Sequence, residues 1–265
     1  METERGVAGV NGARLWYEIA GDGPPLVLVH GFSLDHRMWD DQFAAFAAHH
    51  RVLRYDLRGF GASSIPDGPY RHEDDLAALL TQLGIERATI IGLSFGGQIA
   101  VDFALAYPDM VRELIPVDSV LGGHRSSPEW DAEVIPVWKA GRAGDIATAK
   151  SLWLGTGLFT PARRDPAVGA RLEHMVMQYS GWHWSHRDPV QSIEPPAAAQ
   201  LSRIAARTLV VVGGEDLPDL LAVADQLARE IPGAQKLVLP GIGHMANMEA
   251  PNIFNDAVRQ FLTVP

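Results

Sequence analysis

Short apolar runs alternate with longer amphipathic stretches along most of this chain. The apolar runs are rich in valine, isoleucine and leucine and are not interrupted by polar residues, a pattern typical of strands buried on both faces of a sheet. We predict strands at residues 7–10, 13–19, 26–29, 52–55, 89–91, 114–117, 209–212 and 237–239. The first two flank Asn11-Gly12, a strong signal for a two-residue hairpin turn.

The amphipathic stretches between these runs predict helices. They lie at residues 38–48, 72–83, 98–107, 217–230 and 252–262. Strands that alternate with helices in this way form a mostly parallel sheet covered by helices on both faces. We therefore predict an α/β fold with an eight-stranded, mostly parallel sheet.

The alternation stops between the sixth and seventh predicted strands. Residues 121–201 contain several helix-like stretches and no clear strand. No linker-like stretch rich in proline or serine divides the chain. We predict one core domain made of residues 1–120 and 202–265, with residues 121–201 inserted as a helical cap. Five of the seven tryptophans fall in this insertion, at positions 130, 138, 153, 182 and 184.

A serine stands between a predicted strand and a predicted helix. The sequence Gly92-Leu93-Ser94-Phe95-Gly96 fits the G-x-S-x-G pattern, in which a sharp strand-to-helix turn lifts the serine hydroxyl out of the sheet. Glycines on both sides leave room for that strained turn. The N-terminus of the following helix directs backbone N–H groups toward an anion beside the serine. Ser94 is therefore a candidate nucleophile.

Two later strands end in the residues that could activate Ser94. The strand at 209–212 leads into Gly213-Gly214-Glu215-Asp216, and the strand at 237–239 leads into His244 between glycine-rich turns. The chain order is Ser, acid, His. Asp216 is the preferred acid, and Asp118, at the end of the strand at 114–117, is the alternative. The acid would hold the tautomer of His244 and stabilise its protonated form.

These motifs together resemble the serine-nucleophile branch of the α/β-hydrolase superfamily, from about Val7 onward. His30-Gly31-Phe32 resembles the loop that supplies the first oxyanion-hole donor in that superfamily. The resemblance implies that the backbone N–H groups of Phe32 and Phe95 form the oxyanion hole, and that the cap is inserted after the sixth strand. We interpret His30 as a brace for its loop. The resemblance implies a reaction that needs no cofactor.

Residues 37–42 and 243–251 resemble those of 3-oxoadipate enol-lactonases and related small esterases. That resemblance implies hydrolysis of a small-molecule carboxylic ester or lactone through an acyl-enzyme. The loop Gly59-Phe60-Gly61 is similar to that of C–C bond hydrolases, but those generally have tryptophan where this chain has Met245. Cofactor-free perhydrolases share the same triad and remain an alternative. A ligand-binding sensor with slow turnover is an alternative of another class.

An aromatic cap can form the roof of an apolar pocket and select the substrate. The candidate pocket residues are Trp182, Trp184, Trp153, Trp138 and Met245. Because Trp182 and Trp184 are two positions apart, both face the pocket only if the chain there is extended; on a helix they diverge. His183 and His186 lie nearby, but no recognised metal-ligand pattern includes them, and we predict no metal site.

Charge and composition narrow the choice of partners. The chain has 265 residues, no cysteine and a formal net charge of −10 from 22 basic and 32 acidic side chains. A surface of this charge repels nucleic acid and anionic membranes. The acidic first residues lack the apolar segment of a signal peptide. We expect a cytoplasmic enzyme that binds a small-molecule substrate and neither nucleic acid nor a membrane; the sequence does not indicate its oligomeric state.

Overall fold

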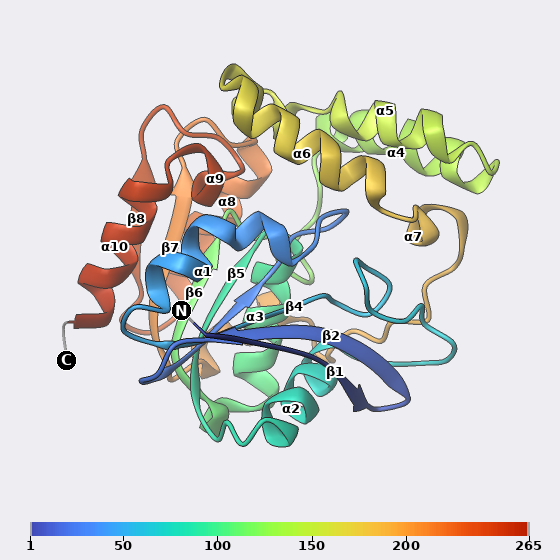
Figure 1. Ribbon diagram of the computed structural model, residues 1–265. Coiled ribbons are helices and arrows are strands. Elements are labelled where there is room, and N and C mark those ends of the chain that lie inside the picture. Colours follow the sequence, from blue (N-terminus) through green and yellow to red (C-terminus); the bar gives the residue numbers. More distant parts are fainter. Residues whose placement is uncertain (1, 264–265) are drawn as a thin grey trace.

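The computed structural model describes residues 2–263 and contains one eight-stranded sheet (Figure 1). Its strands are β1 (Thr3–Val10), β2 (Ala13–Ala20), β3 (Pro25–Val29), β4 (Arg51–Tyr55), β5 (Ala88–Leu93), β6 (Val111–Val117), β7 (Arg207–Gly213) and β8 (Gln235–Leu239). They are arranged in the order β1-β2-β4-β3-β5-β6-β7-β8. The β1–β2 and β2–β4 pairs are antiparallel, and the others are parallel. The predicted fold class is confirmed.

Burial explains which strands lie in the middle of the sheet. Every residue of β5 is buried, whereas β1 at the edge exposes Val7.

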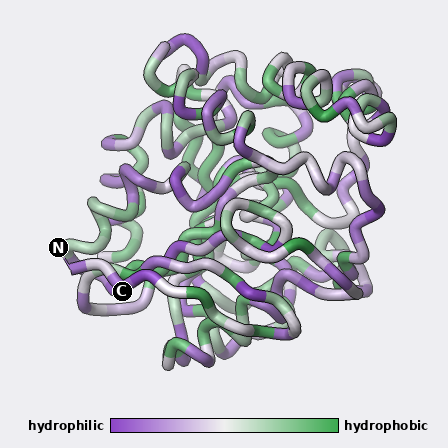
Figure 2. Tube along the Cα trace, turned by 45° about the vertical axis from the view of Figure 1, so that its right-hand side comes forward, coloured by the Kyte–Doolittle hydropathy of each residue, from purple (hydrophilic) through white to green (hydrophobic). Residues whose placement is uncertain are grey.

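The turn between β1 and β2 places both Asn11 and Gly12 at positive φ, 47° and 77°. These are residue types that adopt the left-handed conformation at low cost. Hydrophobic stretches of the chain run through the middle of the molecule in Figure 2.

Helices cover both faces of the sheet. Those of the core are α1 (Asp40–Phe46), α2 (His72–Gln82), α3 (Phe95–Ala106), α8 (Pro218–Glu230), α9 (Ala246–Glu249) and α10 (Pro251–Thr263). The α1 helix packs against α10, and α2 packs against α3. The α10 helix buries Phe254, Val258 and Phe261, which lie on one face at helical spacing. Of the helices in residues 2–263, none has the length and apolar character needed to cross a membrane.

The segment between β6 and β7 is helical, as expected. It contains α4 (Pro128–Arg142), α5 (Ile146–Leu154), α6 (Pro166–Gln178) and α7 (Trp182–Ser185), with several short 3₁₀ turns. In Figure 1 the helices α4, α5 and α6 lie together above the sheet. We refer to residues 121–201 as the cap segment.

Polar contacts join the cap segment to the rest of the chain. Arg171 of α6 forms a 2.8 Å ion pair with Asp41 of α1. Arg37 donates a 2.7 Å hydrogen bond to the side-chain oxygen of Gln178, at the end of α6. These contacts tie α6 of the cap segment to α1 and to the loop before it.

Candidate active site

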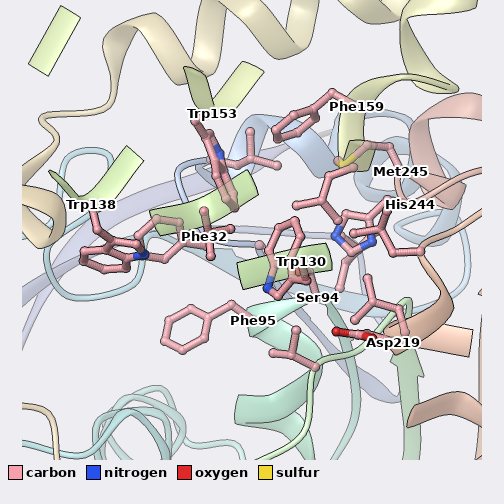
Figure 3. A pocket seen from close by; sticks show the side chains of 18 of the residues that line it. Phe32, Ser94, Phe95, Trp130, Trp138, Trp153, Phe159, Asp219, His244 and Met245 are labelled. Carbon is pink, nitrogen blue, oxygen red and sulfur yellow. The ribbon is translucent and has the colours of Figure 1, made fainter. Parts of the chain in front are cut away.

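Ser94 lies on a strained turn between β5 and α3. Its φ of 57° and ψ of −115° are unusual for a residue with a side chain. A Cβ on Gly92 would overlap the carbonyl of Gly96, and a Cβ on Gly96 would overlap the carbonyl of Val29. Glycine is therefore required at both positions by close backbone approach. The turn presents Ser94 to a cavity at the carboxyl ends of the strands (Figure 3).

His244 and Asp216 meet behind this cavity. Nδ1 of His244 lies 2.9 Å from Oδ2 of Asp216, and both side chains are buried. Since a carboxylate only accepts, Nδ1 carries the proton and Nε2 is left unprotonated in the neutral ring. The other oxygen of Asp216 accepts the N–H of Leu217 at 2.7 Å. The structure therefore brings Asp216 and His244 together, and His244 lines the same cavity as Ser94.

Main-chain hydrogen bonds join the loops that hold these two side chains. The N–H of Gly214 donates to the carbonyl of Leu239, and the N–H of Glu215 donates to the carbonyl of Ile242, both at 2.8 Å. The acid loop after β7 and the histidine loop after β8 are thus held in fixed register. The Asp216–His244 distance therefore depends on backbone pairing as well as on the side chains.

The histidine loop has a brace that the sequence analysis missed. Glu249 accepts the N–H of Gly243 at 2.9 Å and the N–H of Met245 at 3.0 Å, one on each side of His244. Burial raises the pKa of Glu249. The available signal was a glutamate five residues after the histidine, but the pairing depends on the four-residue helix α9, which has no pattern of its own in the sequence.

Asp118, the alternative acid, lies behind Asp216. It is fully buried at a positive φ of 44°, and its Oδ1 accepts the N–H of Gly213 at 2.7 Å. Burial, followed by the charge of Asp216, raises the pKa of Asp118 well above its ordinary value, and the second oxygen of Asp118 has no hydrogen-bond partner in the described residues. Both effects favour the protonated, uncharged form of Asp118. His244 is paired with Asp216, as the sequence analysis preferred.

Phe32 and Phe95, whose backbone N–H groups are the expected oxyanion donors, are both found beside Ser94. Phe95 is the first residue of α3, so its N–H has no partner within the helix. The N–H of Phe32 donates to no backbone acceptor in residues 2–263. Both residues line the cavity. His30 braces the Phe32 loop: its Nδ1–H donates to the carbonyl of Gly31 at 2.8 Å, and its Nε2 accepts the N–H of Leu57 at 3.0 Å.

Burial lowers the pKa of His30, which is consistent with this neutral bracing role. The interpretation of His30 as a brace is therefore supported by two hydrogen bonds.

The cavity has a volume of about 250 Å³ and largely aromatic walls. The cap segment contributes Trp130, Trp138, Trp153 and Trp184, and the core contributes Phe32, Phe95 and Met245. Of the residues that the sequence analysis proposed for the pocket, Trp138, Trp153, Trp184 and Met245 lie there (Figure 3 labels all but Trp184).

Trp182, the remaining candidate, is not among the residues that line this cavity. It begins the short helix α7, where residues two apart point in different directions. Its ring stacks on His186 with centroids 5.2 Å apart, while Trp184 turns into the cavity. The sequence alone left open whether this stretch was helical or extended.

His183 and His186 lie in different surroundings. His183 is buried, stacks on Phe60 at 4.3 Å and forms a 2.7 Å hydrogen bond with the hydroxyl of Tyr179. Burial lowers the pKa of His183 to about 4. The predicted absence of a metal site remains a prediction.

Asp35, His36 and Asp56 are the one group in the described residues whose ligand atoms lie close enough to hold a metal ion. Their oxygens already accept hydrogen bonds. Asp35 pairs with Arg37 at 2.6 Å, and Asp56 accepts the backbone and ring N–H groups of His36 and the N–H of Ala62. This donor set is accounted for by its role in holding the loops after β3 and β4.

Comparison with known proteins gives consistent matches over nearly the whole chain. A 3-oxoadipate enol-lactonase from Acinetobacter baylyi is 30% identical over 240 residues, covering 89% of this chain and 88% of that protein. The crystal structure of an enol-lactonase from Burkholderia xenovorans has a TM-score of 0.84 at 28% identity and covers 97% of this chain and all of that one. A thermophilic esterase from Thermogutta terrifontis has a TM-score of 0.81 at 29% identity, with 98% of both chains covered.

The sequence model of the alpha/beta hydrolase family matches residues 26–257. This range includes the serine turn, the acid loop, the histidine loop and the whole cap segment. The match, the strand order and the enol-lactonase similarity agree, and the chain belongs to the alpha/beta hydrolase family.

Proposed function

We propose that this protein hydrolyses an ester or lactone of a small carboxylic acid, with Ser94 as nucleophile, His244 as base and Asp216 as acid. The observation that carries the proposal is the 2.9 Å pair of Asp216 and His244 beside the cavity to which the strained turn presents Ser94. The enol-lactonase and esterase relatives support the substrate class.

The first half of the proposed reaction forms an acyl-enzyme. Nε2 of His244 takes the proton of Ser94 as Oγ bonds to the substrate carbonyl carbon. The carbonyl electron pair moves onto oxygen, which the N–H groups of Phe32 and Phe95 stabilise. When the carbonyl re-forms, the alkoxy oxygen leaves with the proton from His244. For a lactone this oxygen stays attached to the acyl group as a new hydroxyl.

The second half releases the acid. His244 takes a proton from water, the hydroxide oxygen bonds to the acyl carbon, and Ser94 leaves with the proton from His244. Asp216 stays ionised and stabilises the protonated ring in both halves. Asp118 lies behind Asp216, and its raised pKa favours the uncharged form, which keeps a second negative charge out of the buried site.

The cap segment would form the roof of this site and exclude water during the reaction. Four of its tryptophans line the cavity, so we propose that residues 121–201 act as the substrate-selecting cap. The core boundaries 1–120 and 202–265 belong to the same proposal.

A covalent probe tests the nucleophile. A fluorophosphonate should label Ser94 in the wild-type protein, and peptide mapping should find the adduct there. Ser94→Ala should abolish the labelling, while Ser33→Ala, which removes a serine of the neighbouring loop, should still be labelled at Ser94, only more slowly because it loses the bond from Trp153. An adduct at another residue, or unchanged labelling of Ser94→Ala, would show that the assignment is wrong.

A turnover panel tests the reaction. p-Nitrophenyl esters and simple lactones should be hydrolysed in steady state, with no activity in Ser94→Ala. Binding with slow or absent turnover across the whole panel would favour a ligand-binding sensor. Turnover of peroxide with acetate, or of a C–C substrate, in place of ester hydrolysis would favour the perhydrolase or C–C hydrolase alternative.

A further inference from the structure

The cavity beside Ser94 contains one carboxylate and no side-chain cation. Its walls are formed by described residues, none of which is lysine or arginine. Asp219, in the first turn of α8, is the only carboxylate among them. In Figure 3 the carboxylate group of Asp219 points toward the part of the cavity that contains Ser94.

Asp219 is held in place from the cap segment. Its Oδ2 accepts the N–H of Ser127, the N-cap residue of α4, at 2.8 Å. Its partners are therefore backbone N–H groups and the N-terminus of α8, and no salt bridge to Asp219 occurs in residues 2–263. Asp216 adds a second negative charge just behind His244.

A substrate carboxylate would be poorly accommodated in such a cavity. It would leave water for aromatic walls that offer it no cation, which costs free energy unless the charge is paired. It would also approach the charge of Asp219 in a medium that screens less than water. The net charge of −10 repels anions at longer range.

We propose that the substrate is an uncharged ester or lactone with an apolar acyl group, and that Asp219 excludes acyl groups bearing a carboxylate. This inference rests on the proposed function and narrows its substrate class. 3-Oxoadipate is a dicarboxylate, so its enol-lactone keeps one free carboxylate. The activity named for the similar enol-lactonases is therefore not the one this cavity fits.

Three p-nitrophenyl esters of one chain length test the proposal. The pentanoate ends in a methyl group, the hydrogen glutarate ends in a carboxylate, and the methyl glutarate has that carboxylate capped as a neutral ester. We expect kcat/KM for the hydrogen glutarate to be at least about 100-fold below the pentanoate, which corresponds to about 2.7 kcal/mol. The kcat/KM for the methyl glutarate should be close to that for the pentanoate, because the methyl glutarate has bulk similar to that of the hydrogen glutarate but lacks its charge.

Variants locate the effect at Asp219. Asp219→Asn keeps an oxygen for the N–H of Ser127 and should narrow the pentanoate-to-glutarate ratio by about tenfold. Glu129→Gln is the matched control, because it removes one negative charge from an exposed position on α4, outside the cavity. It should leave the ratio unchanged. Val134→Lys, which places a cation on the cavity wall, should favour the hydrogen glutarate.

The proposal is overturned if the wild-type protein turns over the hydrogen glutarate as well as the pentanoate, or if Asp219→Asn leaves the ratio unchanged. Binding separates this failure from failure of the proposed function. The intact esters are titrated into Ser94→Ala and followed by quenching of the tryptophans that line the cavity. If no ester is hydrolysed by the wild-type protein, the function proposal fails. Preferential binding of the uncharged esters would then still support the inference, and equal binding of the hydrogen glutarate would overturn it.

Discussion

The indole N–H of Trp153 donates a 2.6 Å hydrogen bond to the hydroxyl of Ser33, in a buried setting. Trp153 lies on α5 of the cap segment, while Ser33 follows Phe32 directly and has a positive φ of 63°. The bond therefore joins the roof of the cavity to the loop that presents one of the two proposed oxyanion donors. Trp153 also packs edge-on against the ring of Phe32, with centroids 5.8 Å apart.

This contact predicts that the cap segment positions the oxyanion loop. Trp153→Phe keeps an aromatic ring but loses the donor, and it should lower kcat for ester hydrolysis by about fivefold, because a single hydrogen bond contributes on the order of 1 kcal/mol. Ser33→Ala removes the same bond from the other side and should have a similar effect. In the double variant the two losses should not add, since both remove one interaction. Additive losses would contradict this coupling.

The pairing of His244 predicts different outcomes for the two buried aspartates. Asp216→Asn should lower kcat by about 10⁴-fold, because a carboxamide in place of the carboxylate favours the wrong tautomer of the imidazole. Asp118→Asn keeps an oxygen for the N–H of Gly213 and replaces a carboxyl group whose raised pKa favours its uncharged form, so it should retain most of the activity. Collapse in Asp118→Asn with near-normal activity in Asp216→Asn would move the acid to the end of β6. Circular dichroism should first show that both variants fold.

Two tryptophans of the cap segment give opposite predictions, because one lines the cavity and the other does not. Trp138 lines the cavity and is 38% exposed, so Trp138→Ala should enlarge the site at modest cost in stability. Its preference among p-nitrophenyl esters should shift toward longer acyl chains. Trp182→Ala is the matched control, because Trp182 stacks on His186 away from the cavity. A shifted chain-length profile in Trp182→Ala, with none in Trp138→Ala, would contradict the placement.

Asp102 predicts a pH-dependent stability. It is buried on α3, its Oδ1 has no hydrogen-bond partner, and burial, together with the charge of Glu73, raises its pKa to about 7 from an ordinary 3.8. Between these values the folded state holds a proton that the unfolded state has lost. Stability from this group is therefore present at low pH and falls as pH rises through the window from about 4 to about 7.

Asp102→Asn should remove that loss. The melting temperature of the variant relative to the wild-type protein should be higher at pH 8 than at pH 5, as measured by differential scanning calorimetry. Asp22→Asn changes an exposed loop residue and should show the same difference at both pH values. An Asp102→Asn difference that does not change with pH would count against an uncharged Asp102 in the folded protein.

The sheet could be predicted from the sequence because its inner strands are buried on both faces. Valine, isoleucine and leucine in continuous runs leave little alternative, and each predicted strand lies within an observed one. Helix starts were less well predicted. The α3 helix begins at Phe95, three residues before the predicted start. Gly96 and Gly97 suggested a turn, but they belong to the first turn of the helix, where the Val29 carbonyl and the Ser119 side chain leave no room for a Cβ.

The candidate site was predictable only where strand ends define it. Ser94 follows β5 directly, and Asp216 and His244 stand in the short loops after β7 and β8, so the parallel strands bring them to one edge of the sheet. Glu249 and Asp219 were not found, because each acts through a contact between segments that no local pattern reveals. Whether Trp182 or Trp184 enters the cavity depended on the backbone of a four-residue helix, which single-sequence patterns do not resolve.

The division of the chain between reactive groups and cavity roof has an evolutionary consequence. Ser94, Asp216 and His244 all lie outside residues 121–201, whereas the four tryptophans of the roof all lie inside them. Substitutions in this one continuous stretch can therefore reshape the cavity roof without replacing any of the three residues that we propose to react. Evolution of a new substrate preference then requires changes in only one block of the chain.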